Sequence, residues 1–180
     1  FSLENKSDKN LGNIYNILGL IEFYNGNMDK ALNRYEESIE AFQKVGDLLN
    51  STKPINNIAN IYTQYGKNEK AMEYYEKGLS VVKNRGILHL KLIFLNNIGS
   101  TYMAMYEYDK AIKYMEAARV IAIEIEDANL EFLTNMNLSI IYLLIGNYEQ
   151  SYNYYTMLEE VVNDNNYSFE IISYYYNFLS

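Results

Sequence analysis

Asparagine is the side chain in this 180-residue sequence whose spacing best fits a chemical task. It recurs at a constant interval in one phase of the chain, at Asn57, Asn97, Asn137 and Asn177. The preceding position carries Asn16, Asn56 and Asn96, and Asn60 follows one turn after Asn57. A carboxamide both donates and accepts hydrogen bonds, so it can match the alternating amides and carbonyls of an extended peptide. Because asparagine is mildly unfavourable inside helices, its repetition on one exposed face favours recognition of a peptide backbone.

A compositional explanation of the same pattern stays open. Asparagine makes up roughly one residue in eight of the chain, well above ordinary usage. Repeats that arise by duplication also share residues without sharing a function. The asparagine ladder is therefore a hypothesis about binding, and its alternative is inherited composition.

Groups that could catalyse a reaction are few. His89 is the only histidine, and its place near the start of a predicted helix favours a surface or capping role. No nucleophile and base, and no glycine-rich phosphate loop, can be assembled around it. The acidic pairs Glu36-Glu37 and Glu159-Glu160 lie beside Lys and Arg and indicate solvated faces. Since histidine pairs and an Asp-rich loop are also missing, we expect no enzyme, no cofactor and no metal.

Tyrosine, with 20 copies, is the commonest aromatic residue. Core packing is expected for the tyrosines that fall on packing positions of the repeat, namely Tyr35, Tyr62, Tyr75, Tyr102, Tyr142 and Tyr155. Tyr24 and Tyr176 fall on the other face of a predicted helix. Those two are candidates for contact with a ligand.

The elements that would position these side chains repeat with the same constant period. GNMDKALNRYEESI starts at Gly26, and related segments start at Gly66, Tyr106 and Gly146. Small residues recur where two helices would approach closely: Ala31, Ala71, Ala111 and Ser151. Larger residues recur one turn later: Tyr35, Tyr75, Met115 and Tyr155. Such self-similarity is typical of a solenoid, whose units bury their apolar faces against their neighbours.

Each repeat should also contain an earlier helix and a tight stop. That first helix is marked by Leu18-Gly19, Ile58-Ala59, Ile98-Gly99 and Leu138-Ser139. Glycine predicts a left-handed stop at Gly26, Gly66 and Gly146. Tyr106 stands at the equivalent position, so we expect a different turn there. Pro54 has no amide to donate and is expected to delay or bend the start of its helix.

Bulk composition narrows the classes of partner. With 15 basic and 23 acidic residues the net charge is −8, which disfavours nucleic-acid binding. Cysteine is absent, which fits a reducing compartment, and we expect a cytoplasmic protein. The longest apolar run, residues 140–145, is far short of the roughly 20 residues of a membrane span. The chain starts at Phe1 without an initiator Met, and we expect it to be part of a longer protein.

The repeated residues resemble those of tetratricopeptide-repeat (TPR) proteins. The resemblance rests on Leu18-Gly19, Gly26, Ala31, Tyr35 and Ser38 and their counterparts in the later repeats. The 40-residue unit is similar to that of Pins/LGN-type adaptors and Rap/PlcR-type peptide-pheromone receptors. It implies an all-α fold, a right-handed superhelix of antiparallel helix pairs. Glu22, Tyr106 and Leu158 depart from the family pattern and suggest local adjustment.

The resemblance divides the chain into a single array. Residues 1–10 are expected to be the end of a preceding helix and a linker, and 167–180 a partial first helix of a fifth repeat. The four repeats between them span 11–46, 47–86, 87–126 and 127–166. Without polar caps the end helices, near Leu3 and Phe178, should expose apolar surface and favour self-association.

The resemblance also implies that the first helices line a concave groove. This groove would hold an extended or helical peptide through the asparagines, and Tyr24, Lys53, Lys91, Met103, Leu143 and Tyr176 would select its side chains. Lys53 and Lys91 could each hold a ligand carboxylate. The two lysines and one arginine with which chaperone-binding relatives clamp a carboxylate are not visible. We therefore expect a peptide-binding part of a larger intracellular regulator, with a passive scaffold or oligomerisation module as the alternative.

Overall fold

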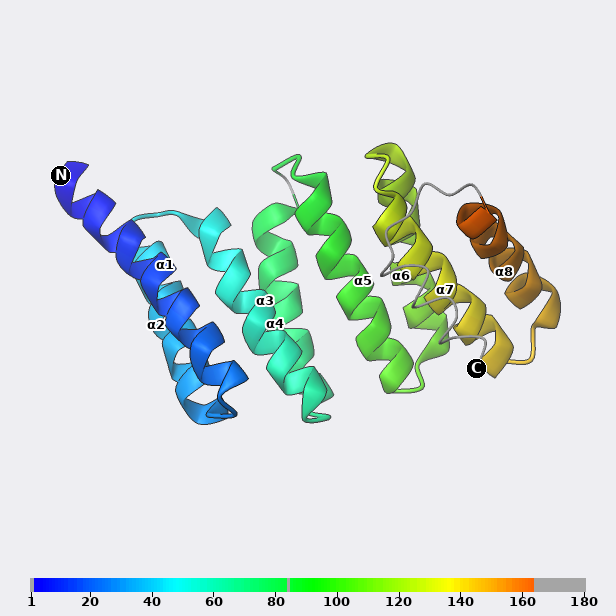
Figure 1. Cartoon of the computed structure of the whole chain (residues 1–180), viewed down its shortest axis with the longest axis horizontal. Coiled ribbons are helices and arrows are strands. Elements are labelled where there is room, and N and C mark those ends of the chain that lie inside the picture. Colours follow the sequence, from blue (N-terminus) through cyan, green and yellow to red (C-terminus); the bar gives the residue numbers. More distant parts are fainter. Residues whose placement is uncertain (1, 84, 164–180) are drawn as a thin grey trace. The chain divides into compact units, whose positions relative to one another are not determined.

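The structure is a computed structural model that describes residues 2–83 and 85–163. This part of the chain forms helices and no strands (Figure 1). The helices are α1 (Ser2–Tyr24), α2 (Met28–Lys44), α3 (Leu48–Gln64), α4 (Asn68–Val82), α5 (Leu88–Ala104), α6 (Tyr108–Glu124), α7 (Ala128–Leu144) and α8 (Tyr148–Asn163). The predicted all-α fold is confirmed.

The helices pack as pairs within two compact units. In unit 1, Phe1–Gly86, α1 packs on α2 and α3 on α4, while α2 also contacts α3. In unit 2, Ile87–Ser180, α5 packs on α6, α7 on α8, and α6 contacts α7. Met28, Asn68, Tyr108 and Tyr148 begin the second helices at equal steps along the chain. The period of the sequence therefore sets the phase of the helices.

The first helix is longer than expected. It runs without a break from Ser2 to Tyr24, so residues 2–10 continue it and do not form the predicted linker. Two ion pairs attach this extension to unit 1: Lys9 Nζ lies 2.7 Å from Asp47 Oδ2, and Lys44 Nζ lies 2.8 Å from Asp8 Oδ2. Contacts with the α2–α3 connection thus accompany the extra turns.

Close helix contacts occur where small residues were predicted. Ala31, Ala71 and Ala111 are fully buried. A Cβ added to Gly19 would lie 2.5 Å from the ring of Tyr35, and one added to Gly99 would lie 2.6 Å from Met115 Cγ. The small residue on the first helix therefore makes room for the large residue on the second.

The turn at Tyr106 does not differ from the glycine turns, so that prediction is wrong. Its φ is +61°, beside +77° at Gly26. Its amide donates to Met103 O at 3.0 Å, and the next amide, of Glu107, donates to Tyr102 O at 3.0 Å. These are the hydrogen bonds of a left-handed helix stop, which a tyrosine adopts at a cost of about 1–2 kcal/mol.

Pro54 does not delay the start of its helix, so the predicted delay is wrong. α3 begins at Leu48, in phase with α5 and α7. Asp47 caps it by accepting a hydrogen bond from Asn50 N at 3.3 Å. A helix that is already capped, with Pro54 buried on its packed face, continues past the missing amide.

Paired tyrosine rings recur between first and second helices. Ring centroids lie 5.7 Å apart in Tyr62–Tyr74 and in Tyr142–Tyr154, and 5.5 Å apart in Tyr102–Tyr114. The first repeat has Glu22 and Arg34 at the same positions. Core packing is confirmed for Tyr35 and Tyr75, which are buried, whereas Tyr62, Tyr102 and Tyr142 are half-buried and pack through these ring contacts.

The second tyrosine of two pairs also contacts the preceding second helix. The Tyr74 hydroxyl donates to the Glu36 carboxylate, and the Tyr154 hydroxyl to that of Glu116. Burial, followed by this hydrogen bond to glutamate, raises the pKa of both hydroxyls. Burial also raises the pKa of Tyr35 to about 12. These side chains are therefore held in their neutral form.

Candidate functional site

Residues of the predicted groove meet at a small pocket in unit 1. The pocket has a volume of about 180 Å³ and is lined by Leu20, Phe23, Tyr24, Tyr35, Asn57, Asn60 and Ile61. α1 and α3 supply all but one of these residues, and α2 supplies Tyr35. Tyr24, Asn57 and Asn60 were candidates from the sequence. Apolar walls with a few carboxamides are the composition expected of a site for one side chain of a ligand.

Both pocket asparagines make hydrogen bonds within unit 1. Asn57 Nδ2 donates to Asn16 Oδ1 at 3.2 Å, which joins α3 to α1. Tyr75 OH donates to Asn60 Oδ1 at 2.6 Å. A carboxamide nitrogen carries two hydrogens, so Asn57 and Asn60 can each still donate to a carbonyl of a ligand.

The other candidate side chains of unit 1 do not line this pocket. Asn16 and Asn56 are half-buried, while Lys53 is exposed. Lys53 is therefore accessible to a ligand carboxylate.

The predicted residues of unit 2 are more scattered. Asn96, Asn97, Asn137 and Lys91 are half-buried, and Leu143 is 51% exposed. Asn96 Oδ1 accepts a long 3.5 Å hydrogen bond from Thr134. Met103 packs against the buried cluster that contains Met115 and Leu138, so it contributes to the packing of unit 2. Tyr176 and Asn177 lie outside the described residues.

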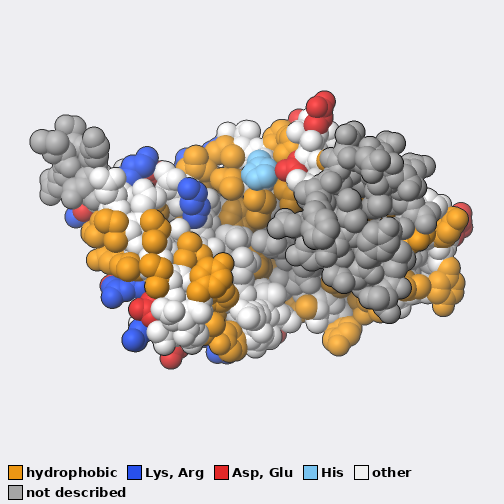
Figure 2. Space-filling view, in the orientation of Figure 1, with side chains coloured by type: hydrophobic (Ala, Val, Ile, Leu, Met, Phe, Trp, Pro, Cys, Tyr) orange, Lys and Arg blue, Asp and Glu red, His pale blue; other side chains and the backbone are white. Residues whose placement is uncertain are grey.

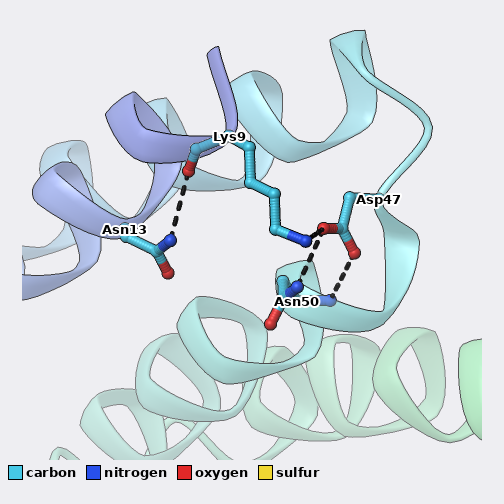
Figure 3. A network of polar contacts seen from close by, with 4 residues as sticks. All are labelled: Lys9, Asn13, Asp47 and Asn50. Atoms are coloured by element: carbon cyan, nitrogen blue, oxygen red, sulfur yellow. Dashed lines mark hydrogen bonds and ion pairs between the residues drawn. The ribbon is translucent and has the colours of Figure 1, made fainter. Parts of the chain in front are cut away.

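A polar network that positions α1 against α3 was not predicted (Figure 3). Asp47 Oδ2 accepts from Asn50 Nδ2 at 2.8 Å and pairs with Lys9, whose carbonyl accepts from Asn13 Nδ2 at 3.3 Å. Burial opposes ionisation of Asp47, but the hydrogen bonds from Lys9 and Asn50 outweigh it and lower its pKa. None of these residues recurs in each repeat, so periodicity could not reveal the network.

Asn135 is a second polar residue that the sequence reasoning missed. It is buried on α7, and its Oδ1 accepts from Arg119 Nε at 2.7 Å. The Arg119 guanidinium also lies 5.8 Å from the centroid of the Tyr154 ring. The other repeats have Tyr15, Ile55 and Leu95 at this position, so no asparagine pattern indicated it.

The single histidine lies at the surface, as its pale blue side chain shows in Figure 2. His89 Nδ1 is 3.3 Å from Asp127 Oδ2, and Asp127 also caps α7 by accepting from Leu130 N at 3.1 Å. In residues 2–83 and 85–163 no group of three or more His, Asp or Glu side chains is placed to hold a metal ion. Among the same residues, no helix has the length and hydropathy needed to cross a membrane.

Several solved structures have a similar fold. BtubC (BKLC) from P. vanneervenii aligns with a TM-score of 0.79 and 24% identity, covering 88% of this chain and 66% of that chain. The apo form of RapI aligns with a TM-score of 0.85 and 18% identity, covering 93% and 46%. A Rap protein complexed with Competence and Sporulation Factor gives 0.69 and 18%, covering 85% and 43%. This chain thus spans less than half of each Rap protein.

Sequence comparison identifies the repeat directly. A search of curated protein sequences finds no match. A family model described as "Tetratricopeptide repeat" matches residues 10–84 and 91–163. These ranges cover most of the chain and contain the periodic helix pairs, so the chain belongs to the tetratricopeptide-repeat family.

Proposed function

We propose that the first helices of this TPR module bind a peptide segment of another protein. The observation that carries the proposal is the unit 1 pocket, where Tyr24, Asn57 and Asn60 meet beside the apolar side chains of Leu20 and Phe23. The carboxamides would hold the peptide backbone, and the apolar walls would accept one side chain. The module acts by binding and not by catalysis, as the sensor or interaction part of a larger intracellular regulator.

The comparison structures support a peptide ligand. One similar fold is that of a Rap protein in complex with Competence and Sporulation Factor. Since identity to that protein is 18%, the ligand of this chain must be found by experiment. Selection from a library of random peptides provides such a ligand without knowledge of the natural partner.

The first prediction concerns the asparagine ladder. The triple variant Asn57→Ala, Asn97→Ala, Asn137→Ala should bind the selected peptide about ten-fold or more weakly, because three hydrogen bonds contribute roughly 0.5–1.5 kcal/mol each. Isothermal titration calorimetry measures the dissociation constants, and circular dichroism verifies that the variant is folded.

A matched control places the same change on other surfaces. Asn33, Asn129 and Asn153 are exposed residues outside the ladder phase, and their replacement by alanine should leave the affinity unchanged. Equal affinity in both triple variants would remove the ladder from the proposal and make asparagine a feature of composition alone.

A second candidate function is association through α1, because the structure exposes apolar side chains along it (Figure 2). Their repeat counterparts on α3 include Ile58 and Ile61, which are buried where α2 contacts α3. The exposed residues are Leu11, Ile14, Ile17, Leu18, Ile21 and Tyr24. A face of this kind is suited to covering by another helix.

The second prediction follows from that face. We expect the unmodified chain to self-associate as its concentration rises. The double variant Ile14→Asp, Ile21→Asp should remain monomeric, because the new charges oppose burial of the face. Sedimentation equilibrium measures both masses. Since Ile14 and Ile21 are about half exposed, the fold should survive the change. If the unmodified chain is monomeric at every concentration, this second function is refuted, while the peptide-binding proposal is unaffected.

A further inference from the structure

A surface cavity of unit 2 lies away from the ladder asparagines, at the ends of the helices. Its volume is about 410 Å³, and it is lined by Tyr106, Glu107, Tyr108, Asp109, Lys110 and Ile145. These residues belong to the connection from α5 to α6, the first turn of α6 and the end of α7. The α5–α6 and α7–α8 connections lie at the same end of unit 2 (Figure 1). We call this cavity the turn pocket.

The turn pocket contains a strained and exposed aromatic residue. Tyr106 has φ +61° and is 78% exposed, so burial does not compensate for its left-handed backbone. Gly26, Gly66 and Gly146 occupy the equivalent positions in the other repeats. A residue that breaks a local rule without a packing gain is expected at functional positions.

Both units have tyrosines at this cavity, Tyr62 and Tyr65 in unit 1, but the adjacent pair Tyr106 and Tyr108 is found only in that of unit 2. An equivalent cavity of about 310 Å³ in unit 1 is lined by Gly26, Met28 and Tyr65, among other residues. Unit 2 has Tyr106, Tyr108 and Ile145 at these three positions. Two adjacent rings, whose centroids are 6.3 Å apart at 89°, thus stand in unit 2 where unit 1 has Gly26 and Met28.

The charges around the rings indicate the chemistry of a ligand. Glu107 and Asp109 bring two carboxylates, and Lys110 pairs with Glu107 while lying 5.1 Å from the centroid of the Tyr102 ring. The amino end of α6 adds about half a positive charge, so the balance stays negative. Aromatic faces beside a carboxylate attract a planar guanidinium more than any other common side chain.

We propose that the turn pocket binds an arginine side chain of a protein partner, against the rings of Tyr106 and Tyr108 and next to the Asp109 carboxylate. This site goes beyond the proposed peptide groove, because it uses none of the asparagines. The partner segment is basic, which complements the net charge of −8.

The test uses a blocked Leu-Arg-Leu tripeptide and its citrulline analogue, which has nearly the same shape without the charge. NMR signals of the tyrosine rings should shift with the arginine peptide, with a dissociation constant in roughly the millimolar range. The citrulline peptide should bind about five-fold more weakly. Asp109→Asn, a surface change, should weaken arginine binding by about the same factor.

The strained backbone of Tyr106 allows a second measurement, that of the melting temperature. Tyr106→Gly should raise the melting temperature by about 2–4 °C while weakening binding about ten-fold. Glu126 is the matched control, because it has φ +55° and is absent from the pocket lining. Glu126→Gly should raise the melting temperature similarly and leave binding unchanged. The proposal would be overturned if the citrulline peptide bound as tightly as the arginine peptide, or if Tyr106→Gly left the affinity unchanged. It would also be overturned if the ring signals showed no saturable shift at about 10 mM peptide.

Discussion

Replacement of Phe42 by alanine should lower the free energy of unfolding of unit 1 by about 3–5 kcal/mol. The Phe42 side chain is 1% exposed, and its ring lies against Gly12 of α1, where an added Cβ would approach within 2.9 Å. Removal of the ring leaves a cavity between α1 and α2 that the neighbouring backbone cannot fill. Since a domain is stable by only about 5–15 kcal/mol, this single change removes a large part of the total.

Urea unfolding followed by circular dichroism measures this loss. Gln43→Ala is the control, because Gln43 is the next residue on the same helix and is exposed. Gln43→Ala should change stability by no more than about 0.5 kcal/mol. If Phe42→Ala changed stability as little as Gln43→Ala, the packing of Phe42 between α1 and α2 would be incorrect.

Replacement of Gly19 by leucine should destabilise unit 1 by about 3 kcal/mol. Exchange of a mid-helix glycine for a good helix former normally gains up to about 1 kcal/mol. Here the new Cβ alone would lie 2.5 Å from the Tyr35 ring, which is 1% exposed and packed between the helices. The steric cost therefore exceeds the gain in helix propensity.

A compensating change separates this clash from a general effect of leucine. Tyr35→Ala on the Gly19→Leu background should make the double variant more stable than the sum of the two single changes. Asn10→Leu, at an exposed position of the same helix, should be nearly neutral. Strictly additive losses in the denaturation curves would contradict direct packing of Gly19 on Tyr35.

The helix pairs could be predicted because the period appears in several residue types at once. Ala31, Ala71 and Ala111 coincide in phase with the helix stops, so each position supports the others. The predictions of the turn at Tyr106 and of a delayed helix start at Pro54 were wrong, since the intrinsic backbone preferences of these two residues oppose the structure that their neighbours impose. At Tyr106 the amide hydrogen bonds of the turn outweigh the steric preference of a single residue.

The candidate site could be predicted only in part. Of the candidates from the sequence, Asn57, Asn60 and Tyr24 line one pocket, whereas Met103 contributes to packing in unit 2. Asn135 and the turn pocket escaped notice because a search for period detects what repeats share. Residues that make one repeat different from the others are found only when the structure brings them together.

The hydrogen bonds of Asn57 and Asn60 have a consequence for the energetics of binding at the unit 1 pocket. Asn16 fixes one carboxamide and Tyr75 fixes the other, at 3.2 Å and 2.6 Å, before any ligand arrives. Immobilising a flexible side chain on binding costs about 0.5–1.5 kcal/mol, and here folding has already met that cost. The pocket is thus preorganised in unit 1, and the peptide of the proposed function would lose mainly its own conformational entropy there.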